Sequence, residues 1–448
     1  MNYWSIQAII FTIYSWFDKN IQVGNKMLLK KNAWLENCHD SLFQLVLMTN
    51  CFLSFLQGYE RTFIYAAYVL IPISLVIWLF GKPWKNYRNS LLNTLQWVLL
   101  GIILFTTLLH RDFGMWSAMT LSSSVLFFLS IAFQPRSAEK RLLNFQRLSD
   151  WSLLCISCIS LLSLIGGYVS HWPGMVIDNR LFGITISPNS LGGMSMLAIM
   201  LGIIALTSFN NVQWKKWLIC FSFLLNGCAL LLTNSRSSLL ALIVFFAGFA
   251  LYCFLTKIRL GRFVKIFVLL AVVVCLIFLV VRVFFSRGST VSSISDNYSL
   301  FWILDKLSTG RMLLWQVGME IVQGNVLFGI SEQAVHEGLV ALRGADISSL
   351  HNVFVDTLVH HGIIALSVFI IIICMVFYLC VKGMLMKGKI RDLAVMIGLL
   401  FMGCLLTNLL ETTILYSYFP SSFLFFICIG LFDSLRDFDG TSENAAGN

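Results

Sequence analysis

Charged side chains are scarce in this sequence. Only 12% of its 448 residues are Asp, Glu, Lys or Arg, whereas a soluble globular domain carries roughly 25%. Proline is also rare, with six residues, so the chain has few obligatory helix breaks. Hydrophobic residues make up 58% of the total. This composition excludes a soluble globular protein and indicates an integral membrane protein built from long apolar helices.

Motifs of soluble enzymes are absent as well. The sequence has no G-x-x-x-x-G-K-[ST] loop for a nucleotide phosphate and no H-E-x-x-H zinc motif. Cys155 and Cys158 form a C-x-x-C, but they lie inside an apolar stretch, where one helical turn brings them together without a redox role. We therefore expect neither a metal nor a cofactor.

Apolar stretches without interior charges recur along the chain. A helix needs about 17–25 such residues to cross a bilayer core of ~30 Å. The stretches that approach this length are 42–57, 63–80, 91–109, 115–133, 151–169, 189–209, 218–234, 239–255, 266–285, 363–380, 393–410 and 421–435. Residues 3–17 are interpreted as an interfacial helix, with a thirteenth span as the alternative. The predicted fold is all-α, a polytopic transmembrane helical bundle of about twelve spans.

The distribution of Lys and Arg predicts the orientation, because inner loops are enriched in these residues. If residues 18–41 are cytoplasmic, 22 of the 31 lie on the inner side and nine on the outer side. The net charge of +10 therefore reflects topology and does not indicate nucleic-acid binding. We expect five parts along the chain. They are an N-terminal segment (1–41), a bundle of about nine spans (42–285), a long periplasmic loop (286–362), the last three spans (363–435) and a cytoplasmic tail (436–448).

Three arginines stand out on the outer side. Arg236 lies in a tight corner between two spans, and Arg180 precedes another span. Arg311 begins the stretch RMLLWQVGMEIVQGN, whose helical spacing of apolar residues predicts an amphipathic helix within the long loop. Each arginine alone could be a solvated or snorkelling side chain. Together on one face they predict a polyanionic ligand, because guanidinium binds phosphate bidentately and keeps its charge.

A histidine follows the same loop. His351 and Asn352 stand where the loop meets the next hydrophobic stretch. A lone histidine at a membrane boundary is most often an interfacial polar residue. Beside phosphate-binding arginines it becomes a candidate proton acceptor, because the ordinary histidine pKa of about 6.5 suits general-base work near neutral pH.

These residues resemble the O-antigen ligase and O-antigen polymerase superfamily of bacterial membrane glycosyltransferases. The motifs that carry the likeness, in the family's order, are Ser235-Arg236-Ser237-Ser238, then Gly310-Arg311 with Trp315, Gly324 and Gly329, then His351, Asn352, Gly362 and Ala365. Ligases usually end the last motif with G-x-x-G, and Ala365 departs from that pattern. The likeness covers roughly 175–370.

The resemblance implies a reaction and a location. The donor would be a glycan on undecaprenyl diphosphate, and the acceptor a lipid-linked glycan or lipid A–core. The enzyme would be a multi-pass protein of the bacterial inner membrane, surrounded by its lipids, with the active site facing the periplasm. In that family His351 would be catalytic. Residues that would bind the diphosphate are Arg236, Arg311 and Arg180, and supporting residues are Asn352, Ser235 and Gly362.

Two acceptors compete within the superfamily, and another function lies outside it. The motifs do not separate a polymerase, which joins repeat units, from a ligase, which moves the finished chain to lipid A–core. We favour a polymerase, because Ala365 fits a divergent member. A polysaccharide transporter or flippase would instead show charged residues at the bilayer centre and an inverted repeat, and neither is clear in the sequence. The sugar, the linkage and the oligomeric state stay open.

Overall fold

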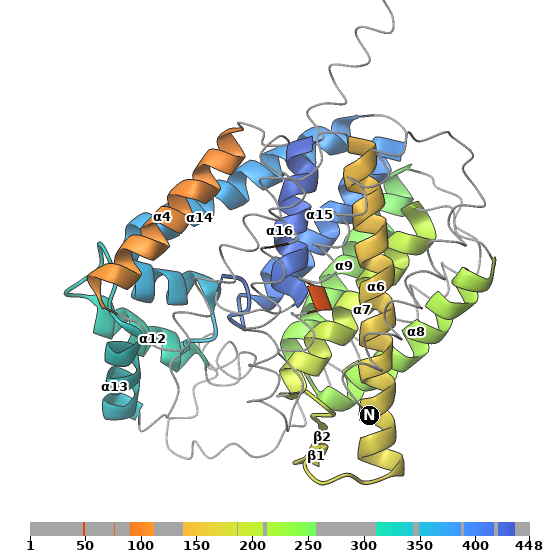
Figure 1. The fold of residues 1–448 in the computed structure, drawn as a ribbon, viewed down its shortest axis with the longest axis horizontal. Coiled ribbons are helices and arrows are strands. Elements are labelled where there is room, and N and C mark those ends of the chain that lie inside the picture. The colour runs from red at the N-terminus through yellow and green to blue at the C-terminus, as the bar shows by residue number, and fades with distance from the viewer. Residues whose placement is uncertain are drawn as a thin grey trace, which may run out of the picture.

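The computed structural model describes residues 48–49, 76, 90–111, 138–185, 187–208, 213–256, 311–343, 349–386, 389–415 and 420–434. In this part of the chain the structure is helical apart from one short hairpin (Figure 1). The helices are α4 (Leu91–Leu109), α6 (Ala138–Leu164) with its π-helical end η3 (Ile165–Val169), α7 (Pro188–Ser208), α8 (Gln213–Thr233), α9 (Arg236–Thr256), α12 (Arg311–Val322), α13 (Glu332–Arg343), α14 (Val353–Leu385), α15 (Lys389–Thr407) and α16 (Pro420–Ser434). The hairpin pairs β1 (Val176–Ile177) with β2 (Arg180–Leu181).

Six of the described helices are long and apolar enough to cross a membrane. They are Leu91–Leu109, Arg141–Val169, Pro188–Ser208, Gln213–Thr233, Arg236–Phe254 and Val353–Leu385. Each overlaps a span predicted from the sequence, and α15 and α16 occupy two more of the predicted positions. The remaining predicted spans, 42–57, 63–80, 115–133 and 266–285, lie wholly or almost wholly outside the described residues. The all-α membrane fold is therefore confirmed for this part, and the total of about twelve spans stays a prediction.

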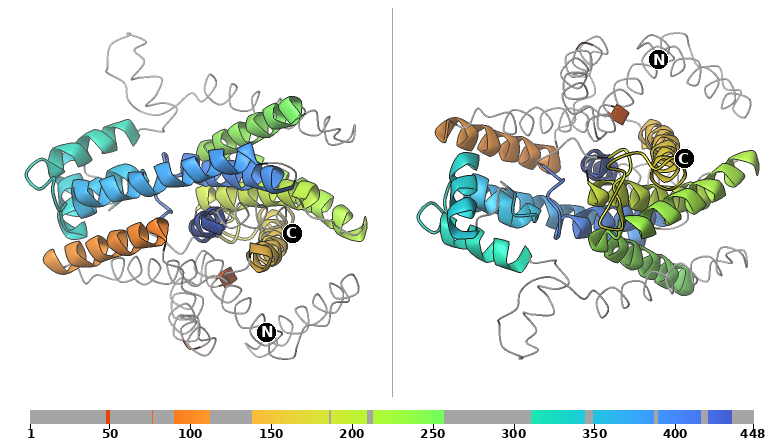
Figure 2. Two further views of the ribbon diagram at one scale, coloured as in Figure 1. Left: turned by 90° about the horizontal axis from the view of Figure 1, so that it is seen from above. Right: turned by 90° about the horizontal axis from the view of Figure 1, so that it is seen from below.

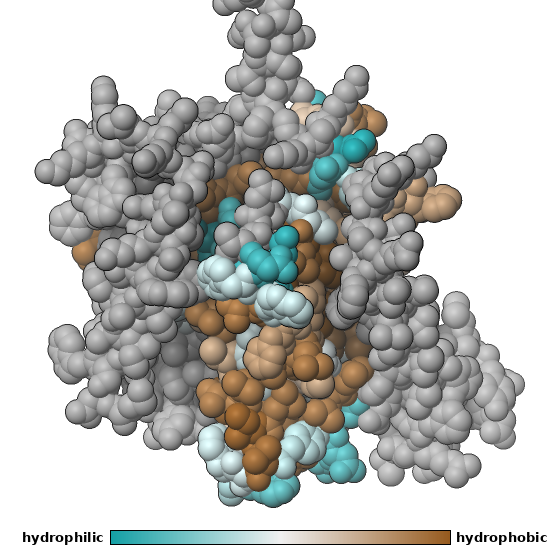
Figure 3. All heavy atoms as spheres, turned by 90° about the vertical axis from the view of Figure 1, so that its right-hand side faces the viewer, coloured by the Kyte–Doolittle hydropathy of each residue, from teal (hydrophilic) through white to brown (hydrophobic). Residues whose placement is uncertain are grey.

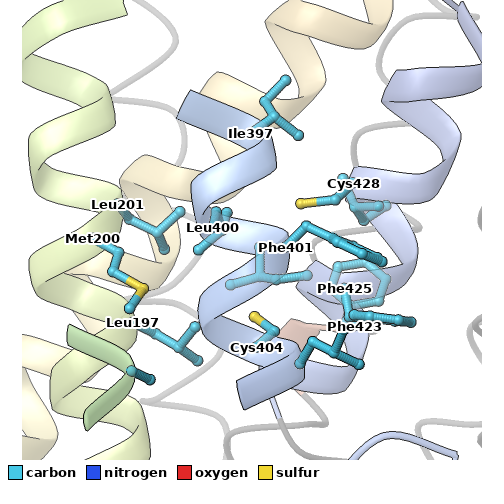
Figure 4. Packing of buried hydrophobic residues seen from close by; sticks show 14 of the residues in the cluster. Leu197, Met200, Leu201, Ile397, Leu400, Phe401, Cys404, Phe423, Phe425 and Cys428 are labelled. Carbon is cyan, nitrogen blue, oxygen red and sulfur yellow. The ribbon is translucent and has the colours of Figure 1, made fainter. Parts of the chain in front are cut away.

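The apolar core lies around α7, which is buried along most of its length because α6, α8, α9 and α15 pack against it. Side chains of α7, α15 and α16 meet in the part of the core shown in Figure 4. The rings of Phe401 and Phe425 stack there, with their centroids 4.5 Å apart. On the face shown in Figure 3, hydrophobic side chains cover much of the described surface, and hydrophilic ones gather at its lower edge and in a patch above the middle. A buried apolar core and extensive apolar surface are both typical of a membrane bundle.

Two contacts join segments that are far apart in the sequence. Lys215 Nζ at the start of α8 lies 2.5 Å from Asp150 Oδ2 within α6. His110 Nε2, just after α4, lies 3.1 Å from the carbonyl oxygen of Phe328 in the loop between α12 and α13. Each pair joins segments that the Lys and Arg distribution puts on one side of the membrane. We call the end that carries His110 and the β1–β2 hairpin the site end, since the residues described below gather there.

The predicted amphipathic helix is present as α12, and a second helix, α13, follows it. Val317 and Val322 of α12 are buried with Val335 and Leu339 of α13 and with Leu350. This small apolar cluster is separate from the main core. Both helices also pack against α14 (Figure 2), so that the amphipathic face of α12 is covered by protein.

The backbone of α14 is broken at Gly362, where φ is 78° and the helix changes direction (Figure 1). The segment after α12 crosses the break, and Ile363 N donates a hydrogen bond to the Val326 carbonyl at 2.8 Å. A Cβ at Gly362 would lie only 2.1 Å from the carbonyl oxygen of Leu327. A glycine is therefore required at position 362, because only glycine combines this φ with so close a crossing of two backbones.

Candidate active site

A carboxylate lies at the centre of the site end. Glu411 stands in the turn between α15 and α16, and its side chain is only 17% exposed. Its Oε1 accepts hydrogen bonds from Arg311 Nη2 at 2.6 Å and from Asn189 Nδ2 at 2.7 Å. Its Oε2 lies 3.4 Å from His351 Nδ1. One carboxylate thus joins residues from three other segments that are far apart in the sequence.

Arg180 reaches this cluster through Asn189. Its Nη2 donates to Asn189 Oδ1 at 3.0 Å, and its Nε donates to the Thr233 carbonyl at 3.0 Å. The hairpin explains its position. Asp178 and Asn179 both have positive φ, as a two-residue type I′ turn requires, and the second strand then begins at Arg180. The tight turn thereby directs the guanidinium towards the α7 and α8 ends.

Arg236 lies beside this cluster, half-buried as the first residue of α9. Arg236 is three residues after Thr233, and the Thr233 carbonyl accepts the hydrogen bond from Arg180. Ser235 fills the turn before it, with its Oγ 2.9 Å from Ser238 Oγ. A Cβ at Gly192 of α7 would come within 2.5 Å of the Ser235 Cβ. Ser235 therefore packs the start of α9 closely against α7, and this packing sets the position of Arg236.

A second, fully buried carboxylate holds the segment that carries His351. Asp356 of α14 is 1% exposed, and it accepts hydrogen bonds from Leu350 N at 2.9 Å and from Ser349 Oγ at 3.2 Å. Thr412, the neighbour of Glu411 in the chain, also donates its hydroxyl to Asp356. His351 has a φ of 54°, in the left-handed region that histidine enters more readily than most residues. The hydrogen bonds of Asp356 stabilise this uncommon backbone.

Two asparagines shape the backbone on either side of the cluster. Asn352 is the N-cap of α14, and its Oδ1 accepts from Phe354 N at 2.9 Å. Asn408 is fully buried, and its Oδ1 accepts from Thr413 N at 2.8 Å. That bond closes the turn in which Glu411 stands. The turn is joined to the start of α14, because the Asn408 carbonyl accepts from the first backbone N–H of that helix at 3.0 Å.

The charge balance of the cluster favours an ionised Glu411. Burial opposes ionisation, but hydrogen bonding to His351 and the positive charge of Arg311 outweigh it and lower the pKa of Glu411 below its ordinary value. The Arg311 side chain is only 11% exposed, so water weakens this ion pair less than it weakens a surface pair. An anionic ligand that binds Arg311 must therefore compete with Glu411.

The structure brings three of the predicted site residues together. Arg180, Arg311 and His351 are linked through Glu411 and Asn189. The sequence interpretation missed Glu411, although it stands alone between two apolar stretches in NLLETTILY. Sorting Asp and Glu by side, as was done for Lys and Arg, would have placed this carboxylate on the same face as the arginines.

Residues 221–370 match the sequence model of a family described as O-antigen ligase. The matched stretch contains Arg236, Arg311 and His351, one from each motif of the resemblance. The resemblance to the O-antigen ligase and polymerase superfamily is thus confirmed over this stretch. Comparison with curated proteins finds no match to the chain.

Replacing Asp356 with asparagine is expected to destabilise the site end. The carboxylate of Asp356 accepts hydrogen bonds from Ser349, Leu350 and Thr412, and the NH₂ group of an asparagine could not accept them. A buried polar group left without its partner lowers the free energy of unfolding by about 1–3 kcal/mol. Thermal unfolding of the purified protein in detergent should show a lower midpoint. Asp178→Asn is the matched control, because Asp178 is exposed in the hairpin turn and asparagine tolerates its positive φ. Equal midpoints for the two variants would contradict the role given to Asp356.

Proposed function

We propose that this protein polymerises lipid-linked repeat units of O-antigen or capsule. A glycan would leave undecaprenyl diphosphate and be transferred to a hydroxyl of a second lipid-linked glycan. The observation that supports this proposal is the arrangement around Glu411. Arg311 lies on one oxygen of that carboxylate and His351 near the other. A phosphate-binding group and a proton acceptor therefore lie within one small cluster.

The arginines serve the donor. The guanidinium of Arg311 would bind the diphosphate, with Arg180 and Arg236 placed to neutralise its further charge. As the bond to the sugar breaks, negative charge develops on the leaving phosphate oxygen, and prearranged guanidiniums stabilise that charge. The donor is already activated by its diphosphate, which agrees with the lack of a nucleotide motif in the sequence.

His351 serves the acceptor. The acceptor oxygen forms a bond to the anomeric carbon, and the bond from that carbon to the phosphate oxygen breaks. The bonding electron pair leaves with the lipid diphosphate, and the acceptor proton passes to the His351 imidazole. Because His351 Nδ1 faces Glu411 at 3.4 Å, Nε2 is the nitrogen assigned to this proton.

The periplasmic face is proposed from the charge distribution. The segments that carry Arg180, Arg311, His351 and Glu411 all fall on the side poor in Lys and Arg. Their contacts with one another support a shared end of the bundle. Undecaprenyl-linked glycans displayed at the outer leaflet of the inner membrane would reach this end without crossing the bilayer.

A ligase is the second candidate, and the description of the matched family favours it. The finished chain would then be moved to lipid A–core by the same arginines and the same base. The geometry around Glu411 serves both reactions equally, because they share the donor diphosphate and the attack by a hydroxyl. They differ in the acceptor alone.

A gel of the surface polysaccharide from a deletion strain tests the proposal. Loss of a polymerase should leave a single repeat unit on the core. Loss of a ligase should instead leave bare core, with long chains stranded on the lipid carrier. Restoring the gene on a plasmid should restore the ladder. An unchanged ladder in the deletion strain would refute glycan transfer by this protein.

A further inference from the structure

Glu411 has contacts that a purely structural carboxylate does not need. A turn can be held by backbone bonds, and Asn408 already holds this one. Glu411 instead uses both of its oxygens on functional side chains, Arg311 and His351. It also lies beyond the stretch 221–370 that matches the O-antigen ligase family. The likeness to that family therefore assigns Glu411 no role.

The geometry points to Glu411 as a positioning residue. It pairs with the donor-binding Arg311 first and orients the base His351 after the donor has bound. Its two oxygens are shared between Arg311 at 2.6 Å and His351 at 3.4 Å. A bound diphosphate draws Arg311 away, and the carboxylate is left facing His351. It then holds the imidazole with Nε2 free to accept a proton, and it stabilises the imidazolium that forms. This inference rests on the proposed function, since it assumes a diphosphate donor and a histidine base.

The surroundings of Glu411 allow this exchange of partners. Its ionisable neighbours are Arg311 from the start of α12 and His351 from the segment before α14. Arg180 lies one hydrogen bond further away, beyond Asn189. Asp356 faces the same turn through Thr412 and adds a second negative charge. After Arg311 turns to the ligand, His351 is the remaining hydrogen-bonding partner among these ionisable groups in direct reach of the carboxylate.

The exchange has a consequence for the order of binding. Before the donor binds, Arg311 and His351 share the carboxylate of Glu411. Once the diphosphate has bound Arg311, the carboxylate is left to hold the imidazole alone. The base is therefore best oriented when an activated glycan is present, which favours donor binding before proton removal from the acceptor.

Replacing Glu411 with glutamine tests the inference with purified full-length protein and with lipid-linked glycan extracted from the deletion strain. We expect kcat to fall by about 10- to 1000-fold, because an orienting carboxylate supports general-base help of ~10²–10⁴. The KM for the lipid-linked donor should not rise, because Arg311 stays in place to bind the diphosphate. Glu411→Asp keeps the charge and should recover part of kcat.

Binding of farnesyl diphosphate separates positioning of the base from loss of the site. The glutamine variant should bind this probe at least as tightly as the wild type, because Arg311 no longer has a competing carboxylate. Weaker binding, or a lower kcat that Glu411→Asp does not recover even in part, would overturn the inference. Glu337→Gln is the control, since Glu337 is exposed on α13 and bonded to Gln333 of the same helix. It should leave both measurements unchanged.

Failure of this inference and failure of the proposed function give different results. If Glu411→Gln matches the wild type while His351→Asn is inactive, the positioning role is wrong and the base assignment stands. If His351→Asn transfers glycan at the wild-type rate, the proposed mechanism itself is wrong.

Discussion

His351→Asn is expected to abolish detectable glycan transfer while the protein still accumulates in the membrane. The acceptor hydroxyl is a weak nucleophile, and general-base help is typically worth ~10²–10⁴ in rate. Asparagine suits the test, because it accepts the positive φ of His351 better than alanine does and carries no titratable nitrogen. His351→Ala should give the same loss of transfer. The measurement is a glycan ladder on a gel, normalised to the amount of protein in the membrane.

The structure also selects the control for this experiment. His361 is buried, with its Nδ1 2.7 Å from Thr106 Oγ1, and His360 Nε2 lies 3.8 Å from Asp356. Substitution of either would disturb packing at the break in α14. His336 lies on α13, half-buried and away from this packing, so His336→Ala should keep a wild-type ladder. A wild-type ladder from His351→Asn at normal protein level would remove His351 from the mechanism.

Gly362→Ala is expected to prevent the protein from accumulating, or to lower its thermal midpoint by many degrees. A left-handed φ costs an alanine roughly 1–2 kcal/mol. The added Cβ would also lie 2.1 Å from the Leu327 carbonyl oxygen, and since this is backbone it cannot rotate away. Movement of the crossing would shift α12 and the start of α14, which carry Arg311 and the segment of His351. Membrane protein levels and thermal unfolding in detergent measure the effect.

Gly324→Ala is the matched substitution for this second test. Gly324 lies in the segment after α12 that crosses the break at Gly362, and it belongs to the second motif of the family likeness, yet a Cβ there meets nothing within 4 Å. Its replacement should therefore be tolerated at a normal level and with a normal ladder. Similar losses from both variants would mean that the connection as a whole, and not the crossing at Gly362, determines stability.

The helices could be predicted from the sequence because a bilayer imposes a simple rule. An apolar stretch of the right length must form hydrogen bonds within itself, and a helix does so. The six candidate spans thus fall where the apolar stretches lie. Arg180, Arg311 and His351 could be found in the same way, since charge on the outer side goes against the expected distribution.

The partners of these residues could not be predicted from the sequence. Glu411 lies 100 residues from Arg311 and 222 from Asn189 along the chain, and no periodicity relates such distant positions. Asp356 looks like an ordinary polar residue in the first turn of a helix, and only its burial and its hydrogen bonds reveal its task. The role of Gly362 likewise depends on a segment that crosses it.

The position of Glu411 after Arg180, Arg311 and His351 in the chain also determines when the cluster can form. During synthesis Arg180, Arg311 and His351 leave the ribosome before α15 and the turn that follows it. Until that turn reaches the site end, neither Arg311 nor His351 has the carboxylate that joins them. A protein shortened after α14 would contain every residue of the stretch 221–370 and still lack an assembled site. Insertion of α15 and the turn that follows it is thus the step at which the cluster around Glu411 is completed.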